Sequence, residues 1–234
     1  MPSLLQFPRK LAGYMFLDCS YERYYTSQLW NSKYLCGHNF RHPKEDCRYG
    51  SIAALLRQYS NGGPILDAGC GDGELEDECR GSGLHLIGID YSCIAIAKAQ
   101  QRSIPHCHFV CSDVRTFSSD QTFSIIVFNE SLYYIDAYLE SLYRLGRLLR
   151  TEGVFIVSMF DTLITRRIWK TLQNHLRIVE ETLIRDDTSR IAWNIRVLQR
   201  PRSRQLGRFG GREKEFAEQP SDASYPNEPQ STVP

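Results

Sequence analysis

The stretch Pro64–Glu76, PILDAGCGDGELE, decides the fold of this 234-residue chain. It opens with the apolar pair Ile65 and Leu66, which is typical of a buried strand, and continues to the acid Asp67. Three glycines at alternate positions follow, and glycine allows backbone conformations and close approaches that a Cβ would prevent. The acids after the glycines favour the positive amino-terminal end of a helix. The stretch is therefore predicted to form a strand, a tight glycine turn and a helix that together cradle a ligand.

The spacing of the glycines, G-x-G-x-G, differs from the dinucleotide fingerprint G-x-G-x-x-G. Acids also crowd the turn, where a pyrophosphate would need positive potential, so a cationic cofactor without phosphates fits better. The stretch resembles motif I of the class I S-adenosylmethionine-dependent methyltransferases: an acid, three alternating glycines and a helix. The acids of the turn are Asp72, Glu74, Glu76, Asp77 and Glu78.

Further short apolar runs follow, and most of them end in a polar or acidic residue. The run 84–89 precedes Asp90, which comes 19 residues after Gly71, at a strand end where a carboxylate can accept both hydroxyls of a ribose. Helical segments separate the runs, which predicts a mostly parallel sheet with helices on both faces and a ligand at the carboxyl ends of the strands. The other predicted strands are 108–111, 123–128, 154–159, 177–184 and 190–198, and the predicted helices include 45–59, 137–149 and 166–176.

Composition divides the chain into three parts. Residues 1–48 are rich in aromatic side chains and are predicted to form a helical cap over the ligand site, with ordinary packing as the equal alternative. Residues 49–199 hold the repeated strands and helices. Residues 200–234 are rich in proline, serine, glycine and charge, so they cannot bury enough apolar surface to order themselves.

The formal net charge of +1 argues against a general nucleic-acid-binding surface. No apolar run approaches the ~18 residues of a membrane-spanning helix, and the amino terminus lacks the features of a signal peptide. Eight cysteines are scattered without a C-x-x-C pair, which predicts free thiols in a reducing, cytoplasmic compartment.

The resemblance extends from about residue 49 to residue 199 and implies a Rossmann-like, seven-stranded α/β fold whose last two strands are antiparallel. It implies S-adenosyl-L-methionine as the cofactor. By resemblance, the glycine stretch holds the methionine part and the ribose, Asp90 holds the ribose hydroxyls, and Asp113 with the amide of Val114 holds the adenine. The residues expected to bind the cofactor are Asp67, Gly69, Cys70, Gly71, Gly73, Asp90, Tyr91, Asp113, Val114 and Asn129.

The run 129–134, NESLYY, resembles the segment after strand 4 of small-molecule methyltransferases, including nodulation-type N-methyltransferases. It departs from the Asp/Asn-Pro-Pro-Tyr/Phe motif of enzymes that methylate nucleobases and glutamine, which implies a small-molecule acceptor and no nucleic-acid partner. An acceptor that carries a proton needs a base, and Glu130 and Tyr133 are the main candidates. Tyr134, His38 and His42 are further candidates, and the two tyrosines suit pocket walls equally well.

Three other interpretations compete with this one. Cys36, His38, His42 and Cys47 are potential zinc ligands, but C-x-H-x₃-H-x₄-C is not a usual zinc pattern, so no metal is expected. A nicotinamide-dependent oxidoreductase is disfavoured by the acidic turn. A methyltransferase-like protein that binds without chemistry is disfavoured by the intact acids and glycines.

Overall fold

The structure is a computed structural model that describes residues 26–37, 45–186 and 191–200. The chain divides into two compact units, Met1–Arg200 and Pro201–Pro234, and every described residue belongs to the first unit. The predicted tail, apart from Arg200, and most of the predicted cap thus lie outside the described residues.

A single seven-stranded sheet forms the centre of this unit, in the order β3-β2-β1-β4-β5-β7-β6. The first five strands are parallel, and β7 runs antiparallel to both β5 and β6. This order confirms the predicted Rossmann-like sheet with an antiparallel pair at one edge. The strands are β1 (Ile65–Ala68), β2 (Leu86–Asp90), β3 (Cys107–Cys111), β4 (Phe123–Asn129), β5 (Leu149–Phe160), β6 (Arg177–Asp186) and β7 (Ile191–Gln199).

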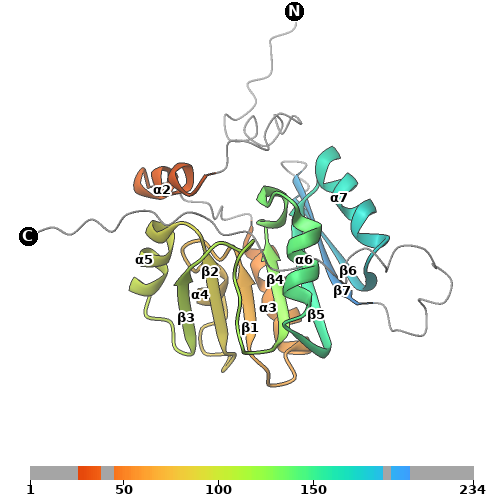
Figure 1. Ribbon diagram of the computed structural model, residues 1–234, viewed down its shortest axis with the longest axis horizontal. Helices are drawn as coiled ribbons and strands as arrows, with labels where there is room; N and C mark the ends of the chain where they lie inside the picture. Colours follow the sequence, from red (N-terminus) through yellow and green to blue (C-terminus); the bar gives the residue numbers. More distant parts are fainter. Residues whose placement is uncertain (1–25, 38–44, 187–190, 201–234) are drawn as a thin grey trace, which may run out of the picture. The chain divides into compact units, whose positions relative to one another are not determined.

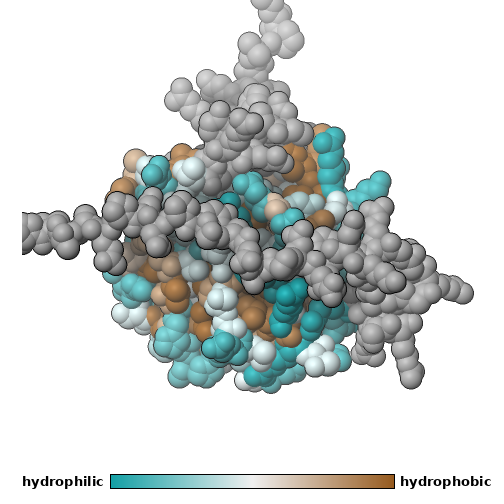
Figure 2. Space-filling model, in the orientation of Figure 1, coloured by the Kyte–Doolittle hydropathy of each residue, from teal (hydrophilic) through white to brown (hydrophobic). Residues whose placement is uncertain are grey.

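Helices cover both faces of the sheet because successive strand residues point to opposite sides. In β1, Ile65 packs in a cluster with α3 and α4, whereas Leu66 packs in the cluster with α6 and α7 on the opposite face. Figure 1 shows α2 at the upper edge of the sheet, and Figure 2 shows a mostly hydrophilic lower rim on the face in view. The helices are α2 (Ser27–Leu35), α3 (Asp46–Tyr59), α4 (Glu74–Glu78), α5 (Cys93–Gln101), η3 (Leu132–Tyr134), α6 (Tyr138–Gly146) and α7 (Leu163–Gln173).

Several predicted boundaries were wrong. The helix predicted at 166–176 begins earlier, at Leu163, because the Thr162 hydroxyl accepts a hydrogen bond from the Thr165 amide (3.1 Å) and caps the helix. The helix predicted over 137–149 ends at Gly146, and β5 begins at Leu149 rather than at residue 154. That strand pairs with β4 across a register shift, and such an irregularity leaves no signal in the local sequence.

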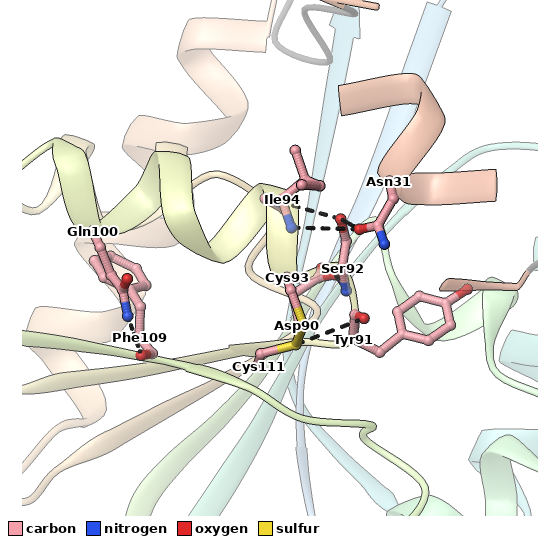
Figure 3. Close-up of a disulfide and its surroundings, with 10 residues drawn as sticks. Asn31, Asp90, Tyr91, Ser92, Cys93, Ile94, Gln100, Phe109 and Cys111 are labelled. Carbon is pink, nitrogen blue, oxygen red and sulfur yellow. Dashed lines mark hydrogen bonds between the residues drawn. A yellow bond between two sulfur atoms is a disulfide. The ribbon is translucent and has the colours of Figure 1, made fainter. Parts of the chain in front are cut away.

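The prediction that all cysteines are free thiols was wrong for one pair. Cys93, the first residue of α5, forms a disulfide with Cys111, the last residue of β3, as Figure 3 shows. The two residues meet because β2 and β3 are neighbours in the sheet. Cytoplasmic location therefore loses its main support and stays a prediction. No helix in the described part of the chain combines the length and apolarity needed to cross a membrane.

Candidate functional site

The glycine turn joins β1 to α4 at the carboxyl ends of the parallel strands. Gly69, Gly71 and Gly73 all adopt positive φ angles, 89°, 58° and 82°, which side chains rarely tolerate. Gly71 is also constrained by contact, because a Cβ there would lie 2.5 Å from the Tyr34 hydroxyl of α2. The amides of Gly69 and Cys70 donate to the Ile89 carbonyl of β2, at 2.8 and 3.0 Å. The turn is thus fixed against the end of the neighbouring strand.

Asp90 ends β2 and faces this turn. One of its oxygens accepts a hydrogen bond from the Gly71 amide (3.1 Å) and the other from the Ser92 amide (2.8 Å). Burial raises the pKa of Asp90 to about 6, although both amides oppose the shift. A carboxylate oxygen has two acceptor positions, so each oxygen retains one for a ligand hydroxyl.

Three further predicted cofactor-binding residues lie after β2 and β3: Tyr91, and the predicted adenine contacts Asp113 and Val114. Burial opposes ionisation of Asp113, but hydrogen bonds from Arg115 outweigh it and lower the pKa of Asp113. The Arg115 guanidinium approaches both Asp113 oxygens, with a shortest distance of 2.6 Å. Val114 is buried, and its carbonyl accepts a hydrogen bond from Arg144. Tyr91 directly follows Asp90, and its carbonyl lies 3.9 Å from the Cys111 sulfur, beside the disulfide in Figure 3.

Helix α2 crosses above these strand ends (Figure 1). Its Asn31 side chain accepts hydrogen bonds from the Ser92 hydroxyl (2.6 Å) and the Ile94 amide (3.4 Å) at the start of α5, which Figure 3 shows. Trp30 packs edge-on against Tyr134 of η3, with ring centroids 5.1 Å apart. Tyr34 is buried over the glycine turn. The helix therefore links the loop after β2 to the loop after β4.

Two acids lie beneath the turn rather than on its surface. Asp67 is 1% exposed and Glu76 is fully buried. Asp67 Oδ1 and both Glu76 carboxyl oxygens have no hydrogen-bond partner among the described residues. Burial, assisted by the charge of Asp90, raises the pKa of Asp67 to about 8. Burial, assisted by Asp67, also raises the pKa of Glu76, so burial opposes ionisation of both groups.

The acidic turn carries less negative charge than the sequence suggests. Arg102 of the α5 C-cap forms ion pairs with three of the five acids: Asp72 at 3.3 Å, Asp77 at 3.3 Å, and Glu74. Burial opposes ionisation of a fourth of these five acids, Glu76. The argument that these acids exclude a pyrophosphate is therefore weaker than predicted. The choice of cofactor therefore depends more on the glycine spacing.

Glu130 connects the loop after β4 to the end of β5. It accepts hydrogen bonds from the Tyr133 hydroxyl (2.9 Å), the Phe160 amide (3.0 Å) and the Ser158 hydroxyl (3.1 Å). Burial raises the pKa of Glu130, and the positive charge of Arg48 opposes the shift. The backbone of Glu130 has a φ of 56°, so the loop is sharply turned at this residue. Tyr133 also packs against Tyr134, with ring centroids 4.4 Å apart.

Arg48 was not predicted from the sequence to be part of the site. It contacts Asn129, the last residue of β4, directly before this loop. Arg48 is 1% exposed and donates hydrogen bonds to the Asn129 side chain and to the Glu45 carboxylate. It lies four residues before Ile52 on the apolar side of α3, and a cation on a buried helix face was the available signal. Asn129, predicted to contact the cofactor, has its side-chain oxygen directed to Arg48.

The remaining candidates are two histidines and two cysteines, and the structure describes only the cysteines. His38 and His42 lie outside the described residues, and Cys36 and Cys47 are exposed free cysteines. Among the residues that the structure describes, no group of three or more side chains could hold a metal ion. This finding leaves the two histidines untested as bases or ligands.

The chain is similar to known methyltransferases. A family model described as a methyltransferase domain matches residues 42–194. Trans-aconitate 2-methyltransferase of Yersinia pseudotuberculosis is 36% identical over 101 residues, which are 42% of this chain and 39% of the relative. The matched part of the chain thus spans about two fifths of the length of that relative.

Two solved structures share the fold. The N-methyltransferase NodS of Bradyrhizobium japonicum WM9, in complex with S-adenosylhomocysteine, has a TM-score of 0.58 at 22% identity and covers 70% of this chain and 90% of its own. The 1,6-didemethyltoxoflavin-N1-methyltransferase of Burkholderia thailandensis has a TM-score of 0.63 at 17% identity, with 86% and 94% covered. At these identities the likeness establishes the fold.

Proposed function

The chain belongs to the methyltransferase domain family, and on that premise we propose that it transfers a methyl group from S-adenosylmethionine to a small organic molecule. The observation that carries the proposal is the hydrogen bond from the Gly71 amide to Asp90, which places a carboxylate at the glycine turn. Trans-aconitate, a small organic acid, is the substrate named for one relative, and it supports an acceptor of small size. The absence of a Cβ at Gly71 allows the Tyr34 hydroxyl of α2 to lie against the turn.

The cofactor would supply an electrophilic methyl group on a sulfonium ion. In this proposal Asp90 accepts the ribose hydroxyls, and Tyr91, Asp113 and Val114 border the adenine. Asp67 acts from below, by holding the turn in shape, because it is almost completely buried. The aromatic rings of Trp30, Tyr34 and Tyr134 can face a cation and exclude water from it.

Methyl transfer from sulfur is an in-line displacement, so most of the rate enhancement can come from alignment in a dry site. For an acceptor that carries a proton, we propose that Tyr133 takes the proton and passes its own hydroxyl proton to Glu130. The hydrogen bond from Tyr133 to Glu130 provides the path, and the raised pKa of Glu130 favours its role as the final proton acceptor. The other predicted bases His38 and His42 lie outside the described residues.

Transfer of a labelled methyl group tests the proposal. The full chain is incubated with methyl-labelled S-adenosylmethionine and panels of small carboxylic acids and amines, and label is sought in the acceptors. An enzyme transfers label to at least one acceptor, with S-adenosylhomocysteine as the second product. Cofactor binding with no transfer to any acceptor or metabolite extract would favour the non-catalytic alternative. The nicotinamide alternative has no support in the family match.

A further inference from the structure

A pocket of about 310 Å³ lies between α7 and the β6–β7 hairpin, at the edge of the sheet remote from β1. Figure 1 shows α7 beside these two strands. Arg166, Trp169 and Lys170 reach it from one face of α7, since they are spaced at i, i+3 and i+4. Leu183 of β6 and Arg196 of β7 line the strand side. The volume is at the lower end of the ~300–1,000 Å³ range of small-molecule sites.

Cations dominate the lining of this pocket. Asp161, its only acidic lining residue among those described, is held by Arg166 through two hydrogen bonds of 2.8 Å. Arg196 donates to Glu181 at 2.8 Å through its Nε atom. Lys170, four residues after Arg166, has no ion pair among the described residues. Two cations at i and i+4 repel each other unless an anion lies between them.

Two hydrogen-bond donors of the lining residues are buried without an acceptor. The indole Nε1 of Trp169, a residue that is 3% exposed, has no hydrogen-bond partner in the described part of the chain. Arg196 Nη1 is also buried and has no hydrogen-bond partner among the described residues. The Arg196 guanidinium lies 4.5 Å from the centre of the Trp169 ring. A buried donor without an acceptor is costly, by about 1–3 kcal/mol in typical proteins. The pair of donors therefore points to an acceptor that belongs to a ligand.

We propose that this pocket is a second ligand site, for a small organic molecule that carries one or more carboxylates. A carboxylate offers the acceptor oxygens that Trp169 and Arg196 lack, and Lys170 supplies a compensating charge. The Trp169 ring and Leu183, which is 43% exposed, provide an apolar wall for the carbon skeleton. The site is distinct from the glycine turn and does not depend on the proposed methyl transfer.

The pocket lies close to the loop after β4. Asp161 directly follows Phe160, whose amide donates to Glu130 at 3.0 Å. A ligand at the Asp161 end of the pocket would therefore lie near the segment predicted to hold the methyl acceptor. The ligand can accordingly affect turnover, although its binding is measured without any cofactor.

The indole N–H signal of Trp169 provides a direct test by nuclear magnetic resonance. The full chain contains Trp30, Trp169 and Trp193, so Trp169→Phe identifies the Trp169 signal by its loss. Citrate serves as the probe at constant ionic strength, because salt screens non-specific attraction. We expect a saturable shift of the Trp169 signal with citrate and none with neutral triethyl citrate.

Charge reversal on α7 supplies a matched pair of variants. Lys170→Glu and Arg167→Glu change the same charge on exposed positions of one helix, but only Lys170 lines the pocket. We expect Lys170→Glu to weaken citrate binding by roughly tenfold or more, because repulsion replaces attraction. Arg167→Glu should weaken it less than about twofold, since that side chain points elsewhere.

Three results would overturn the proposal. They are an absent or non-saturable Trp169 shift, equal weakening in the two α7 variants, and inorganic phosphate binding as tightly as citrate. Calorimetry with S-adenosylhomocysteine, run on the same samples, reports separately on the cofactor turn. A loss of citrate binding with intact cofactor binding in Lys170→Glu would confirm that the two sites are independent.

Discussion

Asp67 and Glu76 form the least expected feature at the scale of single residues, because they are two buried acids in contact with other acids. A Cβ at Gly88 would lie 2.8 Å from Glu76 Oε1 and from the Cys70 sulfur, which shows how closely the pocket beneath the turn is packed. Asp90 and Asp72 add negative charge, and Arg102 is the cation that opposes it. The thiols of Cys79 and Cys107 also face Glu76, and its charge contributes to their raised pKa values.

These raised pKa values predict a loss of stability at alkaline pH. A carboxyl whose folded pKa lies above its unfolded value stabilises the fold while protonated, and this contribution is lost as pH rises through the folded pKa. For Asp67 that value is about 8. For each such group the loss is about 1.4 kcal/mol per pH unit between the unfolded and the folded pKa, and it levels off above the folded pKa, where both states are ionised.

The melting temperature of the wild type is therefore expected to fall between about pH 6 and 8, where ordinary carboxyl groups no longer titrate, and to level off above about pH 8. In Glu76→Gln the fall should be smaller, because one of the two buried carboxyl groups that oppose ionisation is gone. Asp120→Asn, at an exposed position, is the control and should follow the wild type. A wild-type melting temperature that is constant over this interval would show that Asp67 is already ionised.

A second prediction at this scale concerns Glu130 and Tyr133. If they pass a proton, Glu130→Gln and Tyr133→Phe should each lower turnover by ~10²–10⁴-fold for an acceptor that carries a proton. Glutamine keeps a hydrogen-bond acceptor for the Phe160 amide, so the melting temperature should change little. For an acceptor that needs no base, turnover should survive in both variants. An equal loss with both kinds of acceptor would mean that the pair only shapes the loop.

At the scale of elements, the disulfide joins the start of α5 to the end of β3, just before the predicted adenine-binding residues Asp113 and Val114. It closes a loop of 18 residues, for which loop entropy alone gives about 3 kcal/mol. A reducing agent should therefore lower the melting temperature of the wild type by several degrees. In Cys93→Ser/Cys111→Ser the reducing agent should have no effect, since both partners are gone. A wild type that is insensitive to reduction would show that the bond contributes nothing.

The elements also show where sequence reasoning succeeded. The central strands were predictable because each is a local apolar run with a polar residue at its end, as in β2 and β4, or next to its end, as in β1. The glycine turn and Asp90 were predictable from spacing alone, because strand ends of a parallel sheet meet at one edge.

Contacts between distant segments were not predictable in this way. The hydrogen bond between Arg48 and Asn129 spans 81 residues, and the Asn31 contact with Ser92 spans 61. Neither contact leaves a periodic signal in the sequence. The early start of α7 is a different case, because its cap, Thr162, is a local signal that the sequence itself contains.

At the scale of the whole molecule, the described residues of 26–200 carry every proposed contact with cofactor. Residues after 200 are predicted from composition to be dispensable for them. A chain that ends at Pro201 is expected to keep its melting temperature within about one degree and its cofactor affinity within about twofold. A loss of several degrees would mean that the tail docks on the first unit.

The central claim is that the glycine turn and Asp90 bind S-adenosylmethionine, and calorimetry tests it most directly. S-adenosylhomocysteine should bind the full chain saturably at one site, and NADH should not bind. Asp90→Ala should weaken S-adenosylhomocysteine binding by ~1.5–3 kcal/mol, because hydrogen bonds to a charged group are worth about that much. Tight binding of NADH, or an affinity for S-adenosylhomocysteine that is unchanged in Asp90→Ala, would contradict the account.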